Sequence, residues 1–318
     1  MPPSRTTAPV SARAADQVAS VVRPDDRVLL TGAGGWFGST VAALLHGHDA
    51  QVMHVTQRPR TVQHGNGSVE AVAWDWATVR DFAPTVVVDC AFVLRDYIDQ
   101  TSIEQYVHVN TVLTQRLLQV SQLPGVRTVL SVSSGAAAHP VDASRHEVDV
   151  DPYGYLKRQA ELALSGLDAA VDANLVVARP YSLSGTLVSR PRRYAFSDLV
   201  LQAREGAVHV KAGHDVWRRY VGVDDFFAVC LGVGAQRSGT VSSAGELVEF
   251  GALAERVNHV LDARATVTRA DRTGAPADDY YSRDTTWDEA CRSLSYRPAD
   301  LDEQIRTVDA YLAAAGRS

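Results

Sequence analysis

Tyr153 and Lys157 form the pair of residues whose types and spacing best suit acid/base chemistry. They follow Pro152, and their four-residue spacing places both side chains on one face of a helix. A phenol with a pKa of about 10 is a poor acid or base at neutral pH unless a cation stabilises the phenolate. The ammonium of Lys157 would supply that cation. A solvated helix face fits the pair less well, because only two of the 31 basic residues are lysine.

A run of hydroxyl groups precedes this pair in the sequence. Ser131, Ser133 and Ser134 stand at the end of a predicted strand. Because active-site side chains of parallel sheets gather where strands end, a serine here would lie close to Tyr153. Its hydroxyl could then hold the carbonyl oxygen of a substrate.

A glycine-rich turn, residues 31–38, connects the first predicted strand to the apolar helix of Val41 to Leu45. Glycine at its first position permits a tight turn, at the second it lets backbone approach a pyrophosphate, and at the third it lets helix pack closely on strand. The helix N-terminus adds N–H donors. The alternative is a turn that needs glycine only for packing. The turn residues assigned to a dinucleotide are Gly32, Gly35, Trp36, Phe37 and Gly38.

The end of the second strand indicates the form of the cofactor. Thr56-Gln57-Arg58-Pro59-Arg60 stands where a site for NAD would place a carboxylate, and the guanidinium of Arg58 could pair with a 2′-phosphate. The sequence therefore favours NADP(H) as the cofactor, with NAD(H) left open. The alternative for Arg58 is a solvated loop residue with no role in cofactor binding. Asp75 is a candidate for the adenine edge or a surface carboxylate. Ala91, just after the fourth strand, is a further predicted cofactor contact.

Short apolar runs alternate with helical stretches, which predicts βαβ units and a parallel sheet. Because the strands are nearly continuous in Val, Leu and Ala, helices should cover both faces. Helices are expected after each strand, with the third strand the one exception left open. The fold class is α/β, a doubly wound parallel sheet with a smaller C-terminal substrate-binding lobe. The predicted strands are Arg27 to Thr31, Gln51 to Val55, Val69 to Ala73, Thr85 to Asp89, Arg127 to Val132 and Asn174 to Ala178.

The predicted domain organisation has three parts, two of which are made of more than one segment of the chain. Residues 1–22 form a flexible extension, because prolines interrupt any pattern there. Residues 23–180 form the dinucleotide-binding domain, to which 219–245 return. Residues 181–218 and 246–318 form the substrate-binding lobe, with helices at Phe196 to Arg204, Thr285 to Ser293 and Leu301 to Ala315.

Composition excludes several classes of protein. With 31 basic and 37 acidic residues the net charge is −6, the wrong sign for a nucleic-acid binder. No window offers about eighteen consecutive apolar residues, and the first 23 residues lack the apolar core of a signal peptide. A cytoplasmic protein without membrane association is expected. The spacing of the three cysteines matches neither a metal-binding motif nor a disulfide framework, so we expect them to be buried apolar side chains.

The sequence resembles the extended short-chain dehydrogenase/reductase family, of the NAD-dependent epimerase/dehydratase type, over nearly all of residues 26–315. This resemblance implies a Rossmann fold. The family's TGxxGxxG corresponds to residues 31–38, and its RDFxxVDD segment is similar to residues 218–225. The family's YGxxKxxAE motif matches Tyr153, Gly154, Lys157, Ala160 and Glu161. Its helix asparagine matches Asn110, and its RP turn matches Arg179-Pro180.

The resemblance implies a role for each matching residue. Tyr153 is the acid/base, and Lys157 lowers its pKa and binds the nicotinamide ribose. Ser134 orients the carbonyl, with neighbouring Ser133 as the residue it could be confused with. Asn110 holds a helix kink and a proton-relay water. Arg218 binds the diphosphate of a sugar nucleotide; pairing with a neighbouring carboxylate is the alternative.

Three departures from the family pattern bear on the reaction. Ala138-His139 replaces an aromatic-glycine pair, so His139 either faces the substrate or caps a turn. Ser182 replaces an asparagine that often contacts the sugar nucleotide. Gly135-Ala136 follows Ser134 where dehydratases carry an acid/base pair, so dehydration is disfavoured.

The expected activity is that of an NADPH-dependent ketoreductase acting on a nucleotide-activated deoxysugar. A nucleotide-sugar 4-epimerase with tightly held NAD is the alternative within the family. Two further alternatives are a reductase of a non-nucleotide ketone or aldehyde and a non-catalytic NADP-binding protein. The partner is a small molecule, a nucleoside-diphosphate sugar, and a homodimer stays open.

Overall fold

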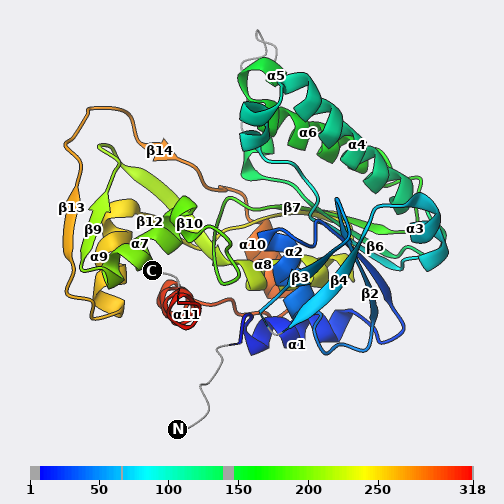
Figure 1. Cartoon of the computed structure of the whole chain (residues 1–318), viewed down its shortest axis with the longest axis horizontal. Coiled ribbons are helices and arrows are strands. Elements are labelled where there is room, and N and C mark those ends of the chain that lie inside the picture. Colours follow the sequence, from blue (N-terminus) through cyan, green and yellow to red (C-terminus); the bar gives the residue numbers. More distant parts are fainter. Residues whose placement is uncertain (1–7, 66, 139–146, 317–318) are drawn as a thin grey trace.

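The computed structural model describes residues 8–65, 67–138 and 147–316, which form a large α/β part and a smaller lobe beside it (Figure 1). Within these residues, no helix is both long and apolar enough to span a bilayer. The same residues contain no cluster of three or more His, Cys, Asp or Glu side chains suited to a metal ion.

The large part is built on a sheet whose eight strands in the described chain have the order β11-β7-β6-β5-β1-β2-β4-β3. All neighbouring pairs are parallel except β3 with β4. All six predicted strands are confirmed within one or two residues. The strands are β1 (Arg27–Thr31), β2 (Gln51–Thr56), β3 (Arg60–Gln63), β4 (Ser68–Ala73), β5 (Val86–Asp89), β6 (Thr128–Val132), β7 (Asn174–Arg179) and β11 (Gly239–Ser242).

The order of elements after β2 differs from the prediction. No helix follows β2; the chain forms the short strand β3, which pairs antiparallel with β4 at the sheet edge. A helix does follow the third predicted strand, as α3 (Trp76–Phe82). Of the four residues of β3 only Val62 is buried, so its sequence carried too little apolar signal to be recognised.

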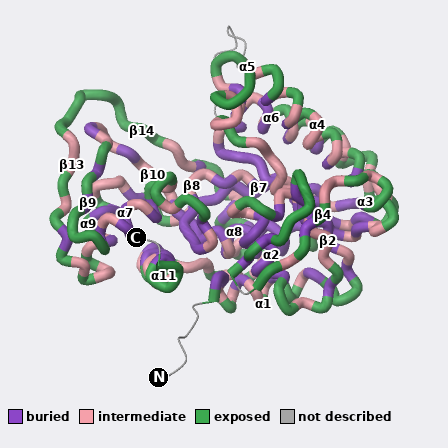
Figure 2. Tube along the Cα trace, in the orientation of Figure 1, coloured by how far each residue is buried: buried purple, intermediate pink, exposed green. Residues whose placement is uncertain are grey.

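Helices cover both faces of this sheet, as the apolar strands predicted. Val28 and Leu30 of β1 pack on one face with α1 (Ala12–Val21), α2 (Trp36–Leu44), α8 (Val223–Gly234) and α10 (Thr286–Ser293). Leu29 packs on the other face, where α4 (Ile103–Ser121) and α6 (Pro152–Ser165) lie. The buried strands and α8 form the centre of the molecule (Figure 2).

The prediction of a flexible N-terminal extension is wrong for residues 12–21. Ser11 caps α1 by accepting from the N–H of Ala14, and its own N–H donates to Asp224 at 2.8 Å. Ala14 and Val18, one helical turn apart, are fully buried in the core that also contains α8. The prolines before residue 10 do not interrupt this helix, which therefore forms part of the large domain.

The smaller lobe contains a mixed sheet and a two-stranded sheet packed against three helices. Its strands are β8 (Ser182–Ser184), β10 (Val216–Gly222), β12 (Glu246–Glu249), β14 (Asp278–Asp279), β9 (Ala207–Val210) and β13 (Thr266–Arg269). Its helices, all close to the predicted bounds where predicted, are α7 (Ala195–Arg204), α9 (Phe250–Val260) and α11 (Leu301–Ala314).

Two segments return from the lobe to the large domain. Strand β10 leads through Gly222 into α8, and β11 then extends the large sheet beside β7. Helix α10 was assigned to the lobe, but Trp287 and Ala290 are buried in the core of the large domain. Short helical segments complete the chain: α5 (Glu147–Val150), η1 (Arg95–Gln100), η2 (Gly135–Ala138) and η3 (Pro191–Arg193).

Candidate active site

The glycine turn after β1 is shaped by its backbone. Gly32 has a φ of 64°, and a Cβ there would lie 2.6 Å from the backbone of Cys90. A Cβ on Gly38 would overlap the carbonyl group of Gly32, so both positions need glycine for packing. Gly35 differs, because a Cβ there would make only an ordinary contact at 3.5 Å. The space beside Gly35, at the N-terminus of α2, is therefore open to a ligand.

The side chains of Trp36 and Phe37 point into the protein. The indole N–H of Trp36 donates to the carbonyl of Thr186 at 2.7 Å, and its ring lies 4.7 Å from that of Tyr194. The ring of Phe37 packs at 5.7 Å against Phe227 in the core. Both side chains thus have partners within the protein, and the cofactor contact predicted for these two residues stays a prediction.

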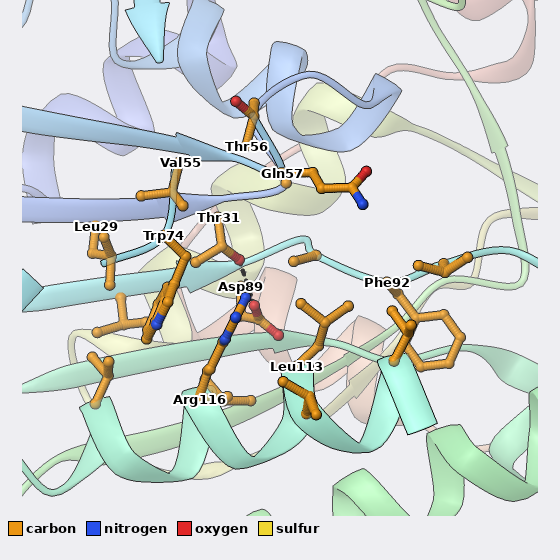
Figure 3. A pocket seen from close by; sticks show the side chains of 18 of the residues that line it. Leu29, Thr31, Val55, Thr56, Gln57, Trp74, Asp89, Phe92, Leu113 and Arg116 are labelled. Atoms are coloured by element: carbon orange, nitrogen blue, oxygen red, sulfur yellow. Dashed lines mark hydrogen bonds between the residues drawn. The ribbon is translucent and has the colours of Figure 1, made fainter. Parts of the chain in front are cut away.

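A cavity of about 440 Å³ opens beside the turn, between the carboxyl ends of β1, β2 and β5 and helix α4 (Figure 3). Its walls are mostly apolar, and the guanidinium of Arg116 lies 5.2 Å from the centre of the Trp74 ring. Gly32 and Ala91, both predicted cofactor contacts, line it. A mostly apolar cavity that begins at a glycine turn suits the adenosine half of a dinucleotide, so the residues present fit this cofactor.

The charged residues considered for the cofactor, Asp75, Arg58 and Arg60, differ in what they contact. Asp75 caps α3, accepting from the backbone N–H of Thr78 at 2.8 Å, so its carboxylate already has a structural role. Arg58 is exposed. The guanidinium of Arg60 instead covers Gly34, where a Cβ would overlap it. Arg60 was missed because only the turn into β3 brings it back over the glycine loop.

The two serines at the end of β6 point to different places. The hydroxyl of Ser133 donates to Glu161, which also accepts from Nε of Arg179 at 2.8 Å. Glu161 and Arg179 of the predicted motifs are therefore partners in one buried network. Ser134 Oγ instead lies 3.4 Å from the phenol oxygen of Tyr280, and a hydrogen bond with Ser134 lowers the pKa of Tyr153. The geometry favours Ser134 over Ser133 as the hydroxyl that meets a substrate.

Tyr153 lies at the start of α6, beside Ser134. Burial raises the pKa of its phenol to about 12, and the hydrogen bond from Ser134 acts in the opposite direction. The ring of Phe92 packs edge-on against it at 5.5 Å. Because Phe92 also lines the nucleotide cavity, Tyr153 is within one side chain of that cavity.

Lys157, one turn further along α6, is buried. Its ammonium donates to the carbonyl of Val132 at 2.7 Å and lies 3.7 Å from the centre of the Phe92 ring. Burial lowers the pKa of Lys157 to about 8, while Asp89 and Cys90 raise it. Helical spacing alone suggested an ammonium directed at the phenol; in the structure it is directed at a carbonyl and an aromatic face.

Asn110 is buried in α4 and holds the segment that follows β5. Its side-chain carbonyl accepts from the N–H of Val93 at 2.9 Å, and its amide donates to the carbonyls of Val93 and Tyr106, both at 3.2 Å. These contacts fix the backbone around Phe92. The helix kink and relay water implied for Asn110 stay predictions.

Two tyrosines at the site were missed from the sequence. The hydroxyl of Tyr280 lies 3.4 Å from Ser134 Oγ, and its ring lies 5.1 Å from that of Tyr181. Tyr181 follows the RP turn, and a Cβ on Gly135 would overlap its ring. Gly135, read only as the absence of an acid, is thus needed for the approach of Tyr181. No local pattern marks Tyr280, which follows β14.

The predicted substrate contacts have different placements. The guanidinium of Arg218 pairs with Asp278 at 2.7 Å, as the carboxylate alternative predicted, and it also lies 5.5 Å from the Tyr280 ring. Ser182 lies in β8, paired with Tyr220 of β10. His139 lies outside the described residues.

A doubly wound parallel sheet with a glycine turn after β1, in a chain that matches the family named next, defines an NAD(P)-dependent enzyme of the extended short-chain dehydrogenase/reductase class. Residues 28–244 match the NAD dependent epimerase/dehydratase family, and the chain belongs to that family.

Solved structures of nucleotide-sugar epimerases share the fold at low sequence identity. The UDP-N-acetylglucosamine 4-epimerase of Methanobrevibacter ruminantium M1, in complex with UDP-N-acetylmuramic acid, is 17% identical with a TM-score of 0.72, over 92% of this chain and 99% of that chain. The UDP-glucose 4-epimerase of Brucella ovis, in complex with NAD, is 19% identical with a TM-score of 0.66, over 89% and 97%. That of Thermotoga maritima, with UDP-glucose, is 18% identical with a TM-score of 0.67, over 92% and 100%.

No curated protein sequence matches the chain. The similarity to the solved structures extends over both the sheet domain and the smaller lobe, and at these identities it establishes the fold.

Proposed function

We propose that the protein is a 4-epimerase of a nucleoside-diphosphate sugar, the alternative rather than the first expectation from sequence. The observation that carries this proposal is the meeting of Ser134 and Tyr153 beside Phe92, at the end of the nucleotide cavity. A dinucleotide bound there supplies the acceptor and donor of hydride. The solved structures that share both lobes are epimerases of UDP-sugars, which supports the same class of reaction.

The chain's own residues would handle the proton and the oxygen. Tyr153 would take the proton from the C4 hydroxyl as hydride leaves C4, and return it after the keto sugar turns its other face. Ser134 would hold the same oxygen through both steps. The proton and hydride that leave are both restored, so no net oxidation occurs.

Arg218 would bind the diphosphate of the substrate. Its guanidinium has five N–H donors, of which the contacts to Asp278 and to the carbonyl of Trp217 use only part. A phosphate can therefore share this group with Asp278. Because Arg218 lies 5.5 Å from the centre of the Tyr280 ring, a diphosphate held by it would lie on the lobe side of Ser134.

A second candidate, an NADPH-dependent ketoreductase of a nucleotide-activated deoxysugar, is favoured by Arg60. A guanidinium that covers the glycine turn is suited to pair with a 2′-phosphate. NADPH that exchanges freely would serve net reduction, whereas an epimerase recovers its cofactor at each turnover.

One assay separates the two candidates. The purified protein is incubated with UDP-glucose and, separately, with a 4-keto sugar nucleotide plus NADPH. Epimerisation gives the C4 epimer with no net change in nicotinamide absorbance. Stoichiometric NADPH oxidation with the keto sugar, and no epimer from UDP-glucose, would overturn the first proposal in favour of the second.

A further inference from the structure

Asp89, the last residue of β5, lies on the face of the large sheet that α4 and α6 cover. Side chains alternate along a strand, so Asp89 points to the same face as Val87, which packs in the core with residues of these helices. Thr31 of β1 is paired in register with Asp89, and its hydroxyl donates to the carboxylate (Figure 3). The carboxylate is therefore fixed at the carboxyl end of the sheet, facing the helices.

Lys157 reaches the same end of the sheet from α6. Its ammonium donates to the carbonyl of Val132 at 2.7 Å, and Val132 follows Ser131, the residue of β6 that is paired in register with Asp89. Asp89 and Lys157 also line one small cavity, of about 10 Å³. The bond to Val132 uses one of the three N–H groups of the ammonium. Strand register and the shared cavity thus bring the carboxylate and the ammonium close together.

The acidic groups that act on this ammonium are Asp89, Cys90 and Glu161. Glu161 already accepts from Nε of Arg179 at 2.8 Å, so its charge is balanced within another ion pair. Burial raises the pKa of the Cys90 thiol, which leaves this group neutral. Asp89 is thus the anion that can balance the charge of Lys157.

We propose that Asp89 is a positioning residue for Lys157: its carboxylate supplies the negative charge that keeps the buried amine protonated on α6, one turn from Tyr153. Asp89 lines the nucleotide cavity as well, so a single carboxylate borders both the cofactor site and the acid/base pair. The effect on turnover rests on the proposed function and on the role that the family resemblance implies for Lys157. The pairing of the two charges depends on neither.

The electrostatics of each group agree with this pairing. Burial lowers the pKa of Lys157 to about 8, and Asp89 is the strongest of the groups that raise it. Burial raises the pKa of Asp89, while the Thr31 hydroxyl and the Lys157 ammonium lower it. Each charge therefore offsets part of the desolvation of the other, and loss of either partner would leave a buried charge uncompensated.

The experiment titrates Lys157 by NMR without cofactor or substrate. The chain contains two lysines, so full-length protein labelled with [ε-¹³C]lysine gives one resonance for Lys157 and one for the exposed Lys211. We expect Asp89→Asn to lower the titration midpoint of Lys157 by about one pH unit or more, because the opposite charge is lost. The Lys211 resonance in the same sample is the internal control and should keep its midpoint.

Glu161→Gln is the matched comparison, because it removes the same charge from the wall of the same cavity. Asp89 stabilises the ammonium more than Glu161 does, so the downward shift of the Lys157 midpoint should be smaller in Glu161→Gln than in Asp89→Asn.

Two results would overturn the proposal: an unchanged Lys157 midpoint in Asp89→Asn, or an equal or larger shift in Glu161→Gln. If Asp89→Asn alone does not fold, the double variant Asp89→Asn/Lys157→Met tests the same pair, since it leaves neither charge without its partner. The double variant should fold, and its failure to do so would also overturn the proposal. Because no sugar nucleotide is used, the proposed function and this inference can fail separately.

Discussion

The nucleotide cavity and the group of hydroxyls at Ser134 lie next to each other but are built differently. Residues 29–120 supply the cavity, from consecutive elements of one sheet and its α4 helix. The cluster of hydroxyl-bearing side chains contains Ser134 and Tyr153 from the large domain. It also contains Tyr181 and Tyr280, from segments that follow the RP turn and β14. One region is formed within a domain, the other where two parts of the molecule meet.

This difference separates binding from chemistry. The cavity offers shape, apolar surface and backbone N–H groups, and needs nothing from the lobe. Ser134 Oγ is contacted by Tyr280 from the lobe, so under the proposed function changes in the lobe should alter turnover while cofactor affinity stays the same. Substitutions on each side test this division.

The largest effect on activity is expected in the cluster of hydroxyl-bearing side chains around Ser134. Tyr153→Phe should lower kcat by about 100- to 10,000-fold, because the group that moves the proton is lost. The dissociation constant of the dinucleotide, measured by fluorescence or calorimetry, should stay nearly the same. Tyr155→Phe is the control; if it rather than Tyr153→Phe removed activity, the assignment of the acid would be wrong.

Lys157 provides a pH-dependent test of the boundary between the two regions. Burial lowers its pKa from 10.5 to about 8 in the folded protein. Below pH 8 Lys157 is protonated in both the folded and the unfolded chain, so the buried ammonium lowers the free energy of unfolding by its full amount. Between pH 8 and 10.5 the folded protein loses the proton first, so the free energy of unfolding should rise by up to about 3 kcal/mol.

This rise is measured by denaturant unfolding of the wild type against Lys157→Met, in which it should be absent. Lys211→Met, a change at an exposed position, is the matched control and should keep it. A wild type and Lys157→Met that respond alike to pH would show that Lys157 is not held as a buried ammonium.

On the nucleotide side, Arg60→Ala should weaken NADPH binding by about 1.5 to 3 kcal/mol and leave NADH binding nearly unchanged. The reason is that only NADPH carries the 2′-phosphate that the guanidinium would neutralise. Arg58→Ala provides the comparison within the same loop. A larger selective loss in Arg58→Ala would return the role to the residue that sequence alone indicated, and equal losses for both cofactors would make Arg60 structural.

The smallest effect is expected at Arg218. Arg218→Ala should raise KM for a sugar nucleotide about tenfold with little change in kcat, because a contact to the diphosphate is made in ground and transition states alike. Arg272→Ala, which removes an exposed arginine paired with Asp215, serves as the control. An unchanged KM with a lowered thermal midpoint would mean that Arg218 only stabilises the lobe through Asp278.

The order of strands and helices could be predicted well where the local pattern is strong. Continuous apolar runs marked all six strands, and the helix after Pro152 carried Tyr153 and Lys157 as expected. The two elements that the sequence did not predict, β3 and α1, were missed for different reasons. Strand β3 buries only Val62, and the packing of α1 depends on Ala14 and Val18 meeting a helix two hundred residues away in the chain.

The sequence by itself determined the fold class, the glycine turn and the Tyr153/Lys157 spacing, because each is written in neighbouring residues whose geometry follows from the backbone. Only the tertiary structure showed that Ser133 donates to the buried Glu161 while Ser134 lies beside the phenol of Tyr280, and that Arg60 covers the turn. Neighbouring residues at the end of a strand point to opposite faces, so a one-residue difference chooses between a buried glutamate and the reacting centre. Tyr280 reaches Ser134 across 146 positions of chain, a contact that packing of the lobe creates and no local pattern records.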